Sequence, residues 1–137
     1  MQGPPTVNRT RRETALLIAA SMLATFASQR FYLHLVNPNA DFFIAGYNIH
    51  HLFIGALIEI PAAIVLALGV GGLWMRRIAC IAFGSGTAMV LDEVVYLITT
   101  DGSNQAYLTP ISLWGAVVLN GAVASVLAVT YLTARRK

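Results

Sequence analysis

AFGSGTAMVLDEVVYLITT, residues 82–100, is a strongly apolar stretch that carries two adjacent carboxylates, Asp92 and Glu93. An ionisable pair inside a lipid-compatible segment is costly, so such residues normally face the interior of a helical bundle and pair with other polar groups. Candidate partners lie on two other apolar segments, and they are Arg30, His34, His50, His51 and Glu59. The stretch therefore predicts a membrane-spanning helix whose charges meet those of its neighbours.

The composition indicates an integral membrane protein. Of the 137 residues, 57% are hydrophobic and only 11% are charged, whereas about 25% of the residues are charged in an average soluble domain. Apolar runs of about 20 residues are needed to cross a bilayer, and the chain has room for four. The basic residues lie at segment ends and not along one face, which argues against a nucleic-acid partner. The single cysteine, Cys80, excludes an intramolecular disulfide and a thiolate metal site.

The apolar segments predict an all-α fold, namely an up-and-down bundle of four transmembrane helices in a single domain, residues 14–137. Residues 1–13 are expected to form a basic tail. Asn48 is the expected N-cap of the second helix, and Pro110 is expected in the first turn of the fourth. Turn-forming residues and glycines separate the four helices, which we expect at about 14–36, 48–69, 78–99 and 107–133.

Basic residues predict the orientation of the bundle. All of the nine lysines and arginines except Arg30 fall on one side of a four-helix topology: in the N-terminal tail, at Arg76 and Arg77, and at residues 135–137. The positive-inside rule places this side in the cytoplasm. We therefore expect a multi-pass protein of the plasma (inner) membrane, surrounded by the lipid bilayer, with both termini cytoplasmic.

Small residues four positions apart predict close helix packing. Gly84 and Ala88 have this spacing on the third helix, and Gly121 and Ser125 have it on the fourth. Such pairs let two helix backbones approach each other in a membrane. A homo-oligomer that forms through the third or the fourth helix is therefore a candidate assembly.

The ionisable residues of three helices fall at one depth. Asp92 comes about 22 Å after Arg77 at a rise of about 1.5 Å per residue, which places it in the outer half of the membrane. At about 100° per residue, His51 and Glu59 share one face of the second helix, which we expect to face the third. The outer ends of the first and second helices bring four more residues to this depth, Arg30, His34, His50 and His51.

A metal site is the first interpretation of this cluster. Imidazoles from two helices and a carboxylate from a third form a ligand set that suits zinc, iron or manganese, and bundle cores often build metal sites from facing helices. Arg30 would lie behind the ligands as a charged neighbour. A haem between His34 and His50 or His51 is not expected, because it would leave the carboxylates without a role. The candidate ligands are His34, His50, His51, Glu59, Asp92 and Glu93.

Two other interpretations remain open. An ion-pair network of Arg30 with Asp92 or Glu93, in which a histidine donates to Glu59, would make the protein a structural or assembly component. A path through Glu59, Asp92 and Glu93 would make it a proton-coupled or small-molecule transporter, with Glu59 beside the helix-kinking Pro61 as the titrating group. No motif identifies a substrate, so the sequence leaves open whether the protein is an enzyme.

The segments HHLFIGALI (residues 50–58) and GSGTAMVLDEVVYL (residues 84–97) together resemble small uncharacterised prokaryotic four-helix integral membrane proteins. The His-His motif lies in the second helix and the Leu-Asp-Glu motif in the third. The resemblance implies a four-helix membrane fold and brings no activity or site residue with it. Two better known families differ, because small multidrug transporters carry an essential carboxylate in the first helix and vitamin K epoxide reductase-like proteins need paired cysteines. This chain has neither feature.

Overall fold

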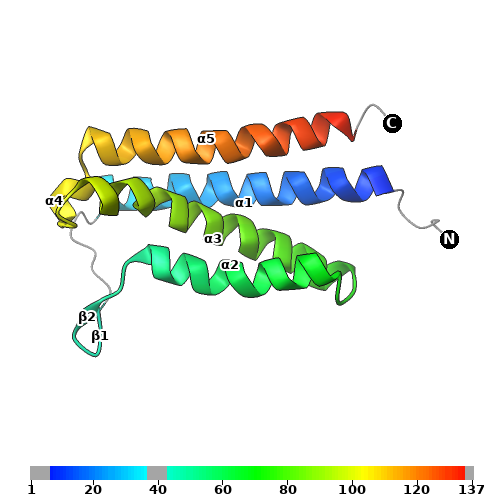
Figure 1. Ribbon diagram of the computed structural model, residues 1–137, viewed down its shortest axis with the longest axis horizontal. Coiled ribbons are helices and arrows are strands. Elements are labelled where there is room, and N and C mark those ends of the chain that lie inside the picture. Colours follow the sequence, from blue (N-terminus) through cyan, green and yellow to red (C-terminus); the bar gives the residue numbers. More distant parts are fainter. Residues whose placement is uncertain (1–6, 37–42, 135–137) are drawn as a thin grey trace.

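A computed structural model describes residues 7–36 and 43–134 of the chain (Figure 1). Four helices in this part are long and apolar enough to cross a membrane. These are α1 (Val7–Leu35), α2 (His51–Leu68), α3 (Leu73–Thr99) and α5 (Pro110–Thr133). A short helix, α4 (Asn104–Tyr107), precedes α5, and the two-residue strands β1 (Phe43–Ile44) and β2 (Tyr47–Asn48) pair antiparallel before α2. The predicted fold, a helical bundle compatible with a membrane, is confirmed at this level.

Helix α3 lies at the centre of the bundle. It packs against α2 on one side and against α1 and α5 on the other, and α1 also contacts α5. In the described part of the chain, the backbone of α2 approaches no other long helix than α3. The attachment of α2 to the rest of the protein therefore depends on its contacts with α3.

The two ends of the bundle differ in what they carry. Figure 1 shows the start of α1, the connection from α2 to α3 and the end of α5 at one end, and the hairpin and α4 at the other. We call the first the basic end, because it carries Arg9, Arg11, Arg12, Arg76 and Arg77. We call the second the cluster end, because it carries Arg30, His50, His51, Asp92 and Glu93.

Glycines let α3 approach two neighbours closely. A Cβ atom added to Gly86 would lie 2.6 Å from the carbonyl oxygen of Gly55 on α2, and one added to Gly84 would collide with the backbone of Ile18 on α1. The small residues of α3 therefore serve packing within the chain. Gly121 on α5 differs, since a Cβ atom there would meet nothing within 4 Å. A homo-oligomer through α3 or α5 stays a prediction.

Helix α1 begins earlier than predicted. Its start at Val7 lies seven residues before the expected start at residue 14. The apolar run marks the span that lipid can surround, whereas the arginines and the glutamate that precede it are also good helix formers. Residues 7–13 of the expected tail are therefore helical, and residues 1–6 lie outside the described part.

Helix α3 likewise begins before the predicted residue 78. It starts at Leu73, after the N-cap Gly72, so Arg76 and Arg77 lie within the helix and not in a connecting loop. Helix α2 ends as expected, because Gly69 adopts a left-handed conformation with a φ of 62°, which glycine allows at little cost.

The predicted fourth helix, 107–133, begins three residues later than expected, with Pro110 in its first turn as predicted. Helix α4 ends at Tyr107 and α5 begins at Pro110, with Thr109 as its N-cap. A proline disfavours helical backbone at the residue before it, so one helix does not run through this point. The turn before α4 is held by Asp101, whose side chain accepts a hydrogen bond from the backbone N–H of Ser103 at 3.0 Å. This turn folds the chain back over the cluster end.

Candidate functional site

The N-terminus of α2 is capped by a carboxylate from α3. The expected N-cap, Asn48, lies in β2, and the actual N-cap, His50, makes no side-chain capping bond. Instead, Oε2 of Glu93 accepts the backbone N–H of Leu52 at 2.7 Å. This N–H is one of those that a helix start leaves without an intrahelical partner, and the helix dipole favours a negative charge there. Glu93 therefore fixes the start of α2 against α3.

Both members of the His-His pair face the carboxylates of α3. Nδ1 of His50 lies 3.1 Å from Oε1 of Glu93. His51 lies between the two carboxylates, with Nδ1 3.3 Å from Oε1 of Glu93 and Nε2 3.0 Å from Oδ2 of Asp92. An ionised carboxylate only accepts hydrogen bonds, and a neutral imidazole donates from one nitrogen. Each ring nitrogen of His51 therefore faces an oxygen of a different carboxylate.

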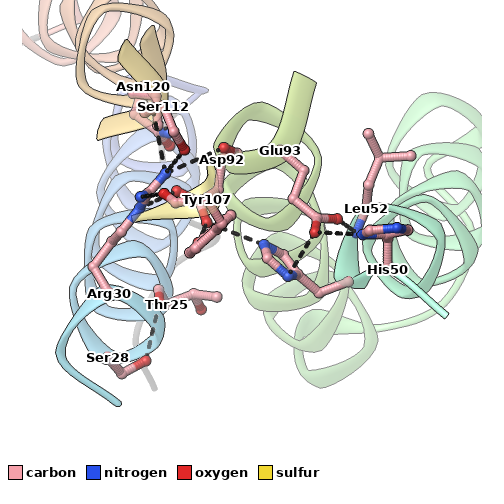
Figure 2. A network of polar contacts seen from close by, with 12 residues as sticks. Thr25, Ser28, Arg30, His50, Leu52, Asp92, Glu93, Tyr107, Ser112 and Asn120 are labelled. Atoms are coloured by element: carbon pink, nitrogen blue, oxygen red, sulfur yellow. Dashed lines mark hydrogen bonds and ion pairs between the residues drawn. The ribbon is translucent and has the colours of Figure 1, made fainter. Parts of the chain in front are cut away.

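Asp92 is the most buried member of the cluster, with no exposed surface. Nε of Arg30 donates to its Oδ1 at 2.7 Å, and the hydroxyl of Tyr107 donates to its Oδ2, which His51 also contacts. Figure 2 shows Asp92 beside Arg30 and Tyr107, with Glu93 next to Leu52 and His50. Both oxygens of Asp92 are therefore occupied by donors from the protein.

Arg30 connects α1 to α3, α4 and α5. Its guanidinium also donates to the carbonyl of Tyr107 and to the hydroxyl of Ser112, each at 3.2 Å. It lies over the ring of Tyr107, with 4.2 Å between its Cζ and the ring centroid. Arg30 thus pairs with Asp92 directly, as the ion-pair interpretation predicted, and does not lie behind the ligands as the metal interpretation placed it.

Tyr107 is only 6% exposed, although tyrosine is enriched where a membrane meets water. Burial and then the neighbouring charge of Asp92 raise the pKa of Tyr107 above its usual value. The hydroxyl therefore stays protonated and donates to Asp92. The edge of the ring also packs against Tyr96, with 5.2 Å between the ring centroids.

The carboxylates of the cluster are paired within it. Asp92 pairs with Arg30, and Glu93 contacts the imidazoles of His50 and His51. Buried charges are tolerated when they are paired and hydrogen-bonded. The side chains of His50 and His51 are 25% and 20% exposed, so the imidazole side of the cluster is the more accessible one.

Two predicted site residues lie outside this cluster. His34 is exposed, and its Nδ1 donates to the carbonyl of Arg30 one turn earlier at 2.9 Å. Glu59 faces α3 as predicted, but it accepts a hydrogen bond from the hydroxyl of Thr87 at 2.9 Å and lies further along α2. Of the six candidate ligands, the structure therefore brings together four, His50, His51, Asp92 and Glu93.

A metal ion finds no ready coordination sphere in the described ranges, 7–36 and 43–134. No group of three or more histidine, cysteine, aspartate or glutamate side chains there is arranged to hold one. The carboxylate oxygens already accept hydrogen bonds from Arg30, Tyr107 and the backbone of Leu52, and a cation would have to displace these donors. The zinc, iron or manganese site stays a prediction without support from this geometry.

Comparison with known proteins adds no family to these observations. No family model matches the chain, and no curated protein or solved structure matches it. The resemblance of residues 50–58 and 84–97 to small prokaryotic membrane proteins stays a prediction. The function must therefore be argued from the geometry of the cluster.

Proposed function

We propose that the protein is a structural or assembly component of the membrane, in which the polar cluster fastens the helices to one another. We call the cluster the charge clamp, and it consists of Arg30, His50, His51, Asp92, Glu93 and Tyr107. The observation that carries the proposal is that the clamp is closed. Asp92 is fully buried, and each of its oxygens accepts a hydrogen bond from another part of the same chain.

A fastening of this kind suits the way α2 is attached. Lipid is as apolar as the helix surfaces, so helices in a membrane associate through close packing and polar contacts. The backbone of α2 approaches α3 alone among the long helices of the described chain. Their contact combines the close approach of Gly55 and Gly86, the bond between Thr87 and Glu59, and the clamp at the start of α2. Three kinds of contact thus act along one pair of helices.

Transport has less support. Glu59, the titrating group of that interpretation, lies eight residues after His51, which is about 12 Å along a helix. Its carboxylate accepts from Thr87 and not from a member of the clamp. A path that joins Glu59 to Asp92 and Glu93 would therefore need a link that the geometry does not supply.

Measurements of bound metal and of proton flux on the same purified protein distinguish a structural component from a metal-binding protein and from a transporter. Elemental analysis compares the wild type with His51→Ala, and liposome flux compares the wild type with Glu59→Gln. We expect no stoichiometric metal and no flux, and a large loss of thermal stability in Asp92→Asn. Stoichiometric metal that His51→Ala removes would establish a metal site instead. A pH-dependent flux that Glu59→Gln abolishes would establish transport.

We further propose that the basic end faces the cytoplasm of a prokaryotic plasma membrane. The support is that the described start of α1, the start of α3 and the end of α5 lie at this end (Figure 1). The start of α3 carries Arg76 and Arg77, while residues 135–137 lie outside the described part. Fusions to the C-terminus test the orientation. We expect a cytoplasmic fluorescent reporter to be active and a periplasmic phosphatase reporter to be inactive, and the reverse result would invert the topology.

A further inference from the structure

A cavity of about 370 Å³ lies at the basic end, where three helices meet. The first turns of α1 form one wall, the start of α3 forms a second and the end of α5 forms a third. Its lining residues are Arg9, Arg12, Glu13, Leu16, Arg77 and Tyr131. The charge clamp lies at the opposite end of the bundle, so this cavity is a separate feature.

The cavity carries more positive than negative charge. Its one carboxylate, Glu13, is already engaged by α3, with Nε of Arg77 at 2.6 Å and Nη2 of Arg76 at 3.5 Å. Arg9 and Arg12 therefore remain without an acidic partner among the residues that the structure describes. The cavity thus has two arginines whose charge its own carboxylate does not balance.

Arg12 is held in place by a neutral group. Its Nη2 donates to the hydroxyl of Tyr131 at 2.9 Å, and its Cζ lies 4.8 Å from the centroid of the same ring. Its Nε is buried and has no hydrogen-bond partner in the described chain. The guanidinium is therefore positioned but neither neutralised nor fully hydrogen-bonded. A planar guanidinium with free donors matches the oxygens of a phosphate group.

The cavity has one aliphatic lining residue, Leu16, and Trp74 lies beside its Arg77. Leu16 lies one turn further into the membrane span than Arg12 and is 58% exposed. Trp74 is 73% exposed beside Arg77, whose Cζ lies 5.5 Å from the indole ring, and tryptophan is enriched where a membrane meets water. The cavity therefore combines charge at the depth of the headgroups with apolar surface at the depth of the acyl chains.

We propose that this cavity binds the headgroup of an anionic phospholipid. The phosphodiester lies among the guanidinium groups of Arg9, Arg12 and Arg77, and the acyl chains follow Leu16 into the bilayer. Basic cavities between transmembrane helices are known to select anionic lipid headgroups in this way. The exposed side chain of Leu16 favours a lipid over a free phosphate ion, because the ion has the same charged oxygens but no acyl chain to contact Leu16.

Native mass spectrometry of delipidated protein tests the proposal. The probes are phosphatidylglycerol, the zwitterionic phosphatidylcholine and inorganic phosphate as a competitor. We expect one phosphatidylglycerol to bind at least tenfold more tightly than phosphatidylcholine. Equal binding of the two lipids would overturn the proposal, and so would displacement by millimolar phosphate, which would assign the site to the free ion.

Three substitutions with the same charge change locate the site. Each contact of an arginine with an anionic headgroup strengthens binding about fivefold, so we expect Arg9→Gln and Arg12→Gln each to weaken phosphatidylglycerol binding by about this factor. Arg11→Gln is the matched control, because Arg11 is exposed on the same helix and does not line the cavity. An equal loss in Arg11→Gln would reveal a diffuse charge effect and contradict the site.

The fold of the variants is controlled separately. Arg12 contacts Tyr131, so Arg12→Gln is accepted only if its melting temperature in detergent matches that of the wild type. Arg9 is exposed, so lipid binding by Arg9→Gln provides the test if Arg12→Gln does not fold. Unchanged lipid binding in a folded Arg9→Gln variant would then contradict the proposal.

Discussion

The cluster end and the basic end both hold arginines and carboxylates, but they differ in how these charges are compensated. At the cluster end, Arg30 and the histidines meet two buried carboxylates, and both carboxylates are hydrogen-bonded within the chain. At the basic end, Arg9, Arg12 and Arg77 share the cavity with one carboxylate, Glu13, and all four side chains keep some exposure. A charge inside the membrane span requires an internal partner, whereas a charge at the headgroups can take its partner from the lipid.

This difference predicts how each end responds to mutation and to salt. Buried pairs are screened little by dissolved ions, whereas exposed pairs are screened strongly. Substitutions at the cluster end should therefore cost much stability at any ionic strength. Substitutions at the basic end should cost little, and less as salt increases.

The largest effect is expected for Arg30→Met. The substitution leaves Asp92 buried without its strongest partner, and the loss of one member of a buried ion pair costs about 3–5 kcal/mol. The free energy of unfolding, measured by titration with dodecyl sulfate in mixed micelles, should fall by this amount. A loss below about 1 kcal/mol, the range of an exposed pair, would show that the clamp does not stabilise the bundle.

A smaller effect is expected from adding a methyl group where α2 and α3 approach each other closely. Gly86→Ala places a methyl group against the backbone of Gly55, and overpacking of this kind costs about 1–3 kcal/mol. Gly121→Ala makes the same chemical change where nothing lies within 4 Å, so it should be neutral or stabilising. The unfolding curve should therefore shift to lower stability in Gly86→Ala alone, and equal shifts of the two variants would contradict the close approach.

A matched pair of tyrosines compares the two ends directly. Tyr107→Phe removes a buried donor from Asp92 and should cost about 1–3 kcal/mol, the range for an unsatisfied buried group. Tyr131→Phe removes the acceptor of Arg12 at the half-buried basic end and should cost less. The difference in melting temperature between the variants is the measurement. A larger loss for Tyr131→Phe would reverse the comparison.

The smallest effect is expected for Glu13→Gln. The pair with Arg77 is partly exposed, with 27% and 37% of the two side chains accessible. Such pairs contribute about 0–1 kcal/mol, and raising the salt concentration should remove even this contribution. Arg30→Met in the same salt series should keep its full effect. Salt dependence of equal size in both variants would indicate that the clamp is hydrated.

The spans and the cluster could be predicted from the sequence because both follow from one-dimensional rules. Length and hydropathy identify the four spans, and the helical rise places Asp92, Arg30 and His51 at one depth. The spacing of His51 and Glu59 also predicted which face of α2 meets α3. The predicted helix starts at residues 14 and 78 were wrong, because the helices begin at Val7 and Leu73. Polar helix formers can extend a helix beyond its apolar run.

The ion-pair interpretation named Arg30 and Asp92 as partners, but the other partners within the cluster could not be predicted because they depend on tertiary structure. His34 shares a face with Arg30 by spacing, but it lies one turn closer to the helix end and stays exposed. Tyr107 reaches Asp92 only because the turn at Asp101 folds α4 back and Pro110 starts a new helix. The role of Glu93 as the cap of α2 depends on the packing of α2 against α3, which no sequence spacing reveals.

The most direct measurement of the central claim is a double-mutant cycle at Arg30 and Asp92. The free energies of unfolding of Arg30→Met, Asp92→Leu and the double variant are measured in the same mixed micelles. If the two side chains form one closed pair, the double variant loses less than the sum of the single losses, with a coupling energy of about 1–3 kcal/mol. Additive losses would contradict a clamp built on this pair.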